Sequence, residues 1–330
     1  MIVSGRDKGR NIGMKVDGGM QLVLNSDANE ANDFHCTVVD QHDMTRGTNG
    51  YGNGTTYFID RPIQATYNNA YRVMSTTDEM KPFLDACLEL DNNTELIQTL
   101  FYEEGMEDAD WSNEAKKYQI FSNNTERPTQ YDYMTKTYTK LVRFFNNYRY
   151  TIFVPTKAAL DDAFAHGLKT IDEIKEYVEE NTNEEGVLDP DAKKIARTMV
   201  LMYANFLKYH FVDQSVFVDN CTATTQCQSA CSDDEGNYVS VSVDQTPNAM
   251  KVTDAAGRAV AVAGQYNLMA RDYELNAAID AARNIRSSSY VALHNIGQYL
   301  CFDAKLKNDF SKAWETPAVA EAYAKKYSLK

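Results

Sequence analysis

The segment from about Pro190 to Tyr209 carries the clearest periodic pattern in the chain. Large apolar side chains recur there at alternating steps of four and three residues, namely Ile195, Met199, Met202, Phe206 and Tyr209. This spacing is typical of one continuous face of a long helix. We interpret the face as part of a protein core; the alternative is a surface that binds a partner.

A run of β-branched and aromatic residues at Tyr150–Val154 predicts a buried strand. Pro155 and Thr156 end this strand, because proline cannot donate a hydrogen bond to a neighbouring strand. The Thr156 side chain is also suited to cap a helix over residues 157–164. The sequence therefore predicts a strand that leads directly into a helix.

The rest of the chain mixes strand and helix patterns. Further strands are predicted at 238–243, 251–262 with a turn at 254–257, 287–294 and 297–302. Capping-box spacing predicts helices that begin at Thr170 and near Thr77. Residues 1–66 are β-rich, with strands at 21–25, 34–39 and 55–60. We interpret 91–137 as an insertion with one or two short helices, and 305–327 as a short amphipathic helix or a loosely held tail.

Composition excludes several classes of protein. The chain of 330 residues has 33 Lys and Arg against 47 Asp and Glu, a net charge of −14. This acidity argues against nucleic acid as a partner, because phosphate recognition requires clustered basic residues. No apolar run approaches the roughly 18 residues of a membrane helix, so we expect no transmembrane span. The first residues show no signal peptide, so the protein is cytoplasmic or this chain begins downstream of its true start.

Three of the six cysteines, Cys221, Cys227 and Cys231, lie in one polar stretch. A disulfide within this stretch would indicate an oxidising compartment. Free thiols and a metal site are the alternatives, although the stretch lacks a fourth soft ligand with zinc-site spacing. We predict no metal site and no cofactor.

Catalytic patterns are absent from the sequence. The five histidines match no metalloprotease or nucleophile motif, and we expect His210 and His294 to be hydrogen-bonded structural residues. The acidic pairs are interpreted as solvated surface. Clustered oxygens at 233–235 suit calcium, but the twelve-residue loop with its central glycine is missing. We therefore predict no catalytic residues.

Three segments, in order, resemble signatures of the fasciclin-like domain family. They are the strand and turn at 150–156, the Tyr209-His210 pair that ends a helix, and the run 264–272 followed by 287–296. The residues that carry the resemblance are Thr151, Phe153, Pro155, Thr156, Tyr209, His210, His294 and Ile296. The last segment departs from the family pattern, because Ala292 and Leu293 separate Val291 from His294. The resemblance spans about residues 68–303.

The resemblance implies an α+β fold in which two small β-sheets form a wedge beneath a layer of helices. It divides the chain into the C-terminal part of a preceding fasciclin-like domain at 1–66, one such domain at 67–303 and a helical tail at 304–330. The domain would carry insertions at about 91–137 and 219–237. The long insertions and the acidic, Asn- and Tyr-rich composition resemble those of tandem-domain, surface-anchored proteins of gut Bacteroidetes-type bacteria, lipoproteins among them. An extracytoplasmic location is therefore expected.

The family resemblance also implies adhesion rather than catalysis. The leading hypothesis is a non-enzymatic module that binds an extracellular protein or a polysaccharide. The alternatives are a carbohydrate-processing accessory protein and a purely structural spacer. Tyr131 and Tyr133 lie in a Tyr- and Asn-rich stretch that we interpret as a candidate binding loop, because exposed tyrosines offer flat, amphipathic contact area.

Overall fold

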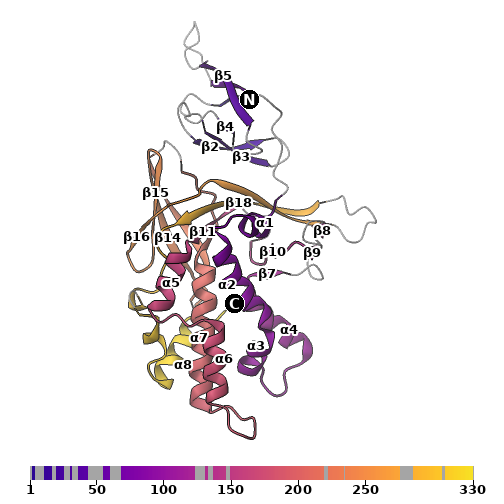
Figure 1. Cartoon of the computed structure of the whole chain (residues 1–330), viewed down its shortest axis with the longest axis vertical. Coiled ribbons are helices and arrows are strands. Elements are labelled where there is room, and N and C mark those ends of the chain that lie inside the picture. Colours follow the sequence, from indigo (N-terminus) through magenta and orange to yellow (C-terminus); the bar gives the residue numbers. More distant parts are fainter. Residues whose placement is uncertain are drawn as a thin grey trace.

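A large mixed sheet with helices packed on it forms most of the structure (Figure 1). The computed structural model describes residues 2–3, 11–16, 20–25, 30–31, 36–43, 55–59, 68–122, 131–132, 137–145, 149–218, 222–233, 235–275, 285–306 and 309–329. The expectation of a mixed α and β fold is confirmed. Within the described part, no helix is both long and apolar enough to cross a membrane.

Eight strands are hydrogen-bonded in the order β16-β15-β14-β13-β12-β11-β18-β17. Their bounds are β11 Arg149–Pro155, β12 Phe211–Val212, β13 Ala223–Ser232, β14 Tyr238–Thr246, β15 Ala249–Thr253, β16 Ala259–Ala261, β17 Leu268–Leu275 and β18 Ile285–Ile296. All neighbours are antiparallel except β11 and β18, which are parallel. Strand β11 is buried from Tyr150 to Pro155. This explains its continuous apolar sequence, because such a strand is covered on both faces.

Two narrow seams join the halves of this sheet. Val212 opposite Ser229 is the one residue pair that links β12 to β13 in the described ladder. A bridge between Val262 and Ile296 brings the chain after β16 back to the end of β18. The expected arrangement was two small sheets that form a wedge. The strands form one continuous hydrogen-bonded order whose two halves meet at the first seam, and the wedge itself stays a prediction.

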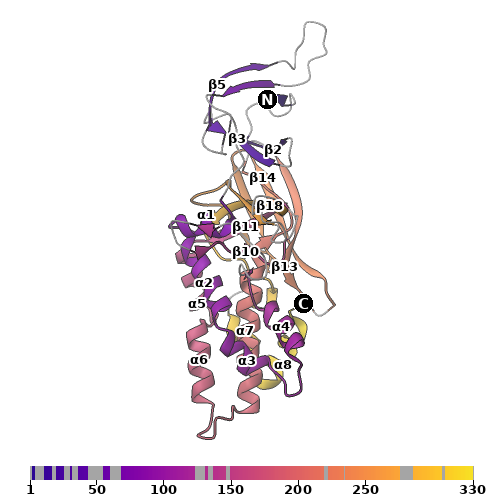
Figure 2. The same cartoon turned by 90° about the vertical axis from the view of Figure 1, so that its right-hand side faces the viewer.

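The long helix lies where the sequence predicts it. Helix α7, Pro190–Tyr209, begins at the Asp189 cap and packs against α3, α6, α8 and β13 (Figure 2). From Thr198 to Tyr209 every side chain is buried, so the predicted face is core. The burial extends beyond one stripe because other helices surround the second half of α7.

Other helices follow the predicted caps in part. Helix α5, Lys157–Ala165, is capped by Thr156, and α6, Ile171–Glu180, has the predicted capping box of Thr170 with Glu173. The helix expected near Thr77 begins later, as α2, Lys81–Asn92, with Met80 at its N-cap. Because the turn at Thr77 ends a helix that was not predicted, α1, Ala70–Thr76, the capping box expected there does not form.

The segment interpreted as an insertion contributes to the core. It contains α3, Thr94–Phe101, and α4, Asp108–Lys117, which agrees with the expected short helices. Four apolar side chains of α3 are buried in the main core, Leu96, Ile97, Leu100 and Phe101. Beyond it, β7 (Phe121–Ser122) pairs with β10 (Leu141–Val142), and β8 (Tyr131–Asp132) with β9 (Thr137–Tyr138).

The C-terminal residues are also part of the core. The predicted strand at 297–302 is an irregular segment that is buried from Tyr299 onward. It is followed by the short 3-10 helices η2, Ala304–Leu306, and η3, Phe310–Ala313. Helix α8, Pro317–Lys326, then packs on α7. The buried carboxylate of Asp303 accepts hydrogen bonds from Lys326 Nζ at 2.9 Å and Tyr327 OH at 2.7 Å. The tail is therefore a helix anchored to the domain.

A six-stranded sheet lies at the N-terminus, in the order β1-β6-β5-β4-β3-β2. Its strands are β1 Ile2–Val3, β2 Asn11–Val16, β3 Met20–Asn25, β4 Glu30–Ala31, β5 Cys36–Asp43 and β6 Thr55–Ile59. These strands agree with the β-rich pattern of residues 1–66. The assignment of this segment to a preceding domain stays a prediction.

Candidate functional site

The three segments that carry the sequence resemblance meet at the centre of the fold. Strand β11 pairs in parallel with β18, so that Phe153 lies opposite His294 and Pro155 opposite Ile296. The backbone N–H of Phe153 donates to the carbonyl oxygen of His210, at the end of α7, at 2.9 Å. The prediction that these segments come together over a shared apolar interior is confirmed.

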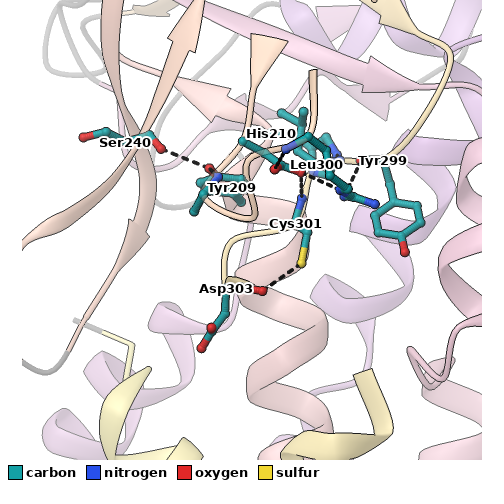
Figure 3. A network of polar contacts seen from close by, with 10 residues as sticks. Tyr209, His210, Ser240, Tyr299, Leu300, Cys301 and Asp303 are labelled. Carbon is teal, nitrogen blue, oxygen red and sulfur yellow. Dashed lines mark hydrogen bonds and ion pairs between the residues drawn. The ribbon is translucent and has the colours of Figure 1, made fainter. Parts of the chain in front are cut away.

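His210 is fully buried, and both of its ring nitrogens have partners. Nδ1 lies 2.8 Å from the Phe206 carbonyl oxygen, and Nε2 accepts the backbone N–H of Leu300 at 3.1 Å (Figure 3). This pattern assigns the proton to Nδ1. Burial lowers the pKa of His210 to about 3, so the ring is neutral at physiological pH. The ring therefore ties α7 to the buried segment after β18.

His294, on strand β18, also uses both ring nitrogens to hold backbone groups. Its Nδ1 accepts the backbone N–H of Asn267 at 3.1 Å, and its Nε2 lies 2.9 Å from the carbonyl oxygen of Val216. Burial lowers the pKa of His294 to about 4. Because the lone pair of each histidine already accepts a backbone hydrogen bond, neither ring is available as a general base.

Tyr209 joins the end of α7 to the other half of the sheet. Its hydroxyl donates to the Ser240 carbonyl oxygen at 3.0 Å and accepts the backbone N–H of Ala255 at 2.8 Å (Figure 3). The phenol ring itself is buried. Tyr209 and His210 thus fix one helix end to β14, to the turn after β15 and to the segment after β18.

The two threonines of the first motif hold backbone groups. Thr151 Oγ1 donates to the Gln214 carbonyl oxygen at 2.7 Å and accepts the N–H of Val216 at 3.1 Å. Thr156 accepts the N–H of Ala159 at the start of α5. The hydrogen bonds of Thr151 and Thr156, like those of the two histidines and Tyr209, therefore have a structural role.

Buried carboxylates are the main polar groups that sequence reasoning missed. Asp272 on β17 accepts the N–H of Ala70 at 2.9 Å, the N–H of Val142 at 3.0 Å and the hydroxyl of Tyr150 at 2.9 Å. The sequence signal for Asp272 was a carboxylate within the strand pattern Leu268–Leu275. Its hydrogen bonds join α1, β10 and β11 to β17.

A second missed carboxylate, Asp254, lies beside the His210 network. It accepts the backbone N–H of Cys301 at 2.9 Å and pairs with Arg258 Nε at 2.9 Å. Arg258 also donates to the Tyr299 carbonyl oxygen and lies 4.4 Å from the Tyr299 ring centre. Cys301 Sγ in turn donates to the Asp303 carbonyl oxygen at 3.2 Å (Figure 3). These contacts hold the irregular segment after β18 in place.

The cysteine stretch is not the disulfide loop that was one alternative at 219–237. Cys227 and Cys231 are free, buried thiols on strand β13, where their side chains enter the core. Burial raises the pKa of Cys227 to about 12 and raises that of Cys231 still further. Cys221 lies outside the described residues. Among the residues that are described, no cluster of His, Cys, Asp or Glu could hold a metal ion.

A cavity of about 180 Å³ lies between β13, the end of α7 and the loop after β10. Its walls include Phe144, Phe145, Lys208, Asp213 and Tyr238. Lys208 is 6% exposed, and its ammonium donates to the Lys117 carbonyl oxygen at 2.6 Å. No pattern in the sequence indicated this site. A lysine in the last turn of a helix is favourable there because of the helix dipole, and it is ordinarily exposed to solvent.

The candidate binding loop lies only partly within the described residues. Tyr131 lies in strand β8, and Tyr133 lies outside the described residues. Its binding role stays a prediction.

A scan against protein-family models gives no match to this chain, and a search among curated proteins finds no significant relative. The resemblance to fasciclin-like domains therefore depends on the sequence motifs and on their arrangement.

Proposed function

We propose that the chain is a non-enzymatic adhesion or ligand-binding module of the fasciclin-like class. One observation supports this proposal most directly: the segments 150–156, 209–210 and 287–296 pack against one another through Phe153, His210 and His294. These segments carry the sequence resemblance, lie far apart in the chain, and meet in one core. On this proposal, the two halves joined at Val212 and Ser229 correspond to the wedge of the family.

The chemistry of the motif residues favours binding over catalysis. Both buried histidines are neutral, with each lone pair occupied by a backbone N–H. Asp272 and Asp254 are likewise saturated by structural hydrogen bonds. In this proposal the module lies outside the cytoplasm, on the cell surface or in the periplasm, and its partner is an extracellular protein or a polysaccharide.

A binding panel tests the proposal. The full chain is immobilised and exposed to matrix proteins, host glycans and bacterial surface polysaccharides, with binding followed by surface plasmon resonance. We expect saturable binding to at least one of them, and no release of sugar fragments from any polysaccharide. No binding at all would favour a structural spacer, and fragment release would favour a carbohydrate-processing protein.

A pair of variants locates the binding surface. Replacing Tyr131 and Tyr133 together by alanine should weaken the binding about tenfold or more, because tyrosines are among the residues that contribute most to interfaces. The matched control is Tyr102→Ala, a tyrosine that is 39% exposed elsewhere on the domain. Equal binding by both variants would remove the tyrosine stretch from the proposal without excluding the module's function.

A further inference from the structure

The buried side chain of Lys208 brings a positive charge to the wall of this cavity. No described carboxylate oxygen lies within 4.0 Å of the Lys208 ammonium, whereas Lys326 pairs with Asp303 at 2.9 Å. An ammonium has three N–H donors, and the hydrogen bond to Lys117 uses one of them. A buried charge of this kind is costly unless something pairs with it. Burial lowers the pKa of Lys208 to about 8, which leaves the group mostly protonated at pH 7.

The walls around this charge are largely aromatic. Phe144 and Phe145 pack edge to face with ring centres 5.4 Å apart, and the Lys208 ammonium lies 5.9 Å from the Phe144 ring centre. Tyr238, which is 55% exposed, stands at the cavity. The surroundings therefore offer apolar contact to a ligand body and one cation to its polar end.

The local strand geometry is irregular at the same place. The ladder between β13 and β14 shifts register between Gln228 and Ser232, both of which line the cavity. Bulges of this kind bend a strand and often accompany binding sites. The register shift therefore lies in the wall of the cavity.

The volume limits what can enter. The cavity of about 180 Å³ is slightly larger than the apolar protein cavities of about 150 Å³ that accept benzene. A single six-membered ring with one small substituent matches that size.

We infer that this cavity binds a small carboxylate with a ring-sized apolar body, whose carboxylate pairs with Lys208 while its ring packs on Phe144 and Phe145. This inference does not depend on the adhesion function. The Asp213 carboxylate also lines the cavity, and its Oδ1 accepts the N–H of Gln228 at 2.8 Å. Asp213 would favour a cationic ligand instead, so the sign of the ligand charge is the decisive measurement.

Three ligands of similar shape but different charge show which sign of ligand charge the cavity prefers. Benzoate, benzamide and benzylamine are titrated into the full chain at pH 7 by isothermal calorimetry, with ligand-observed NMR for weak binding. We expect benzoate to bind at least about tenfold more tightly than benzamide, because a charge-assisted hydrogen bond contributes more than a neutral one. Benzylamine should bind least. Preference for benzylamine, or no binding of benzoate at 10 mM, roughly the weak end of small-ligand affinity, would overturn the inference.

Variants distinguish binding in the cavity from nonspecific binding elsewhere on the protein. Lys208→Met removes the charge but keeps an unbranched side chain only one heavy atom shorter, and it should reduce benzoate affinity about tenfold while benzamide affinity changes little. The matched control is Lys251→Met, an exposed lysine on β15, which should leave both affinities unchanged. Ala230→Phe fills the cavity without altering its charge and should abolish binding of both ligands. Unchanged benzoate binding in either cavity variant would overturn the inference.

Discussion

The ring of Phe153 stacks on the ring of His294, with centres 5.9 Å apart and planes inclined by 29°. The two residues lie directly opposite each other in the parallel pairing of β11 with β18. One belongs to the first motif and the other to the last. The pair therefore joins two distant parts of the sequence at the middle of the sheet, and it explains why the polar nitrogens of His294 face backbone groups from other segments.

Replacing His294 by alanine should destabilise the fold strongly. The change leaves the N–H of Asn267 and the carbonyl of Val216 buried without a partner, so we expect a loss of about 3–5 kcal/mol in the free energy of unfolding. Urea unfolding followed by circular dichroism measures the loss. The matched control is His166→Ala, whose side chain is 41% exposed and which should cost less than about 1 kcal/mol. Equal losses would contradict the structural role.

Acid should destabilise the protein through its two buried histidines. Their pKa values fall from an ordinary 6.5 to about 3 and about 4, so on acidification the unfolded chain binds protons that the native rings do not. Their contribution is complete above pH 6.5 and is lost as the pH falls towards 4, at about 2 kcal/mol for each ring between pH 7 and 5. Asp91 has the opposite effect on stability, because burial raises its pKa to about 7 and the native carboxyl therefore holds its proton at pH 5.

The variant Asp91→Asn isolates that opposing effect. Without the native carboxyl, the gain on acidification disappears, and the stability lost between pH 7 and 5 should increase by about 2 kcal/mol. Denaturant unfolding at both pH values, in the variant and the original chain, gives this difference directly. An unchanged pH difference would show that Asp91 is not protonated in the native protein at pH 5.

Asp272 and Tyr150 should be energetically coupled. Asp272→Asn places an amide NH₂ among backbone donors, and we expect a loss of about 2–4 kcal/mol. Tyr150→Phe removes a single donor to the same carboxylate and should cost about 1–2 kcal/mol. The double variant should cost less than the sum of the two, because the shared hydrogen bond is lost only once. Strict additivity would argue against the contact.

The described thiols should resist modification in the native protein. Cys87, Cys227, Cys231 and Cys301 are all buried, and burial raises the pKa of Cys301 to about 11 and that of Cys227 to about 12. The thiolate is the reactive form, so alkylation with iodoacetamide at pH 8 should be at least about a hundredfold slower than in denaturant. Peptide mapping by mass spectrometry assigns each site. Fast native labelling of Cys227 or Cys231 would contradict their placement in the core.

Local sequence patterns could predict much of the secondary structure. The strand at Tyr150–Val154 and the helix Pro190–Tyr209 agree with their apolar spacing, and Thr170 with Glu173 forms the predicted cap. The predicted start of α2 was wrong, because Thr77 ends α1 and α2 begins only at Lys81. Capping signals of neighbouring helices overlap there, and spacing alone does not show which residue is the boundary.

The polar sites could not be predicted in the same way. Asp272 acquires its partners from positions 202, 130 and 122 residues away, and no periodicity encodes such distances. Lys208 occupies the last turn of its helix, where a lysine is favourable on local grounds alone. Its burial arises only because β13 and the loop after β10 close over the helix end.

The parallel pairing of β11 with β18 also has a consequence for biosynthesis. Arg149 aligns with Tyr290, so the strands of the central ladder are about 140 positions apart in the chain. The ribosome must therefore synthesise nearly the whole domain before β11 and β18 can pair. Helices α5 to α7 and the β14–β15 hairpin can form earlier. Until then β11 has an unpaired backbone edge and exposed apolar side chains, and nascent chains stalled between these two strands should bind chaperones.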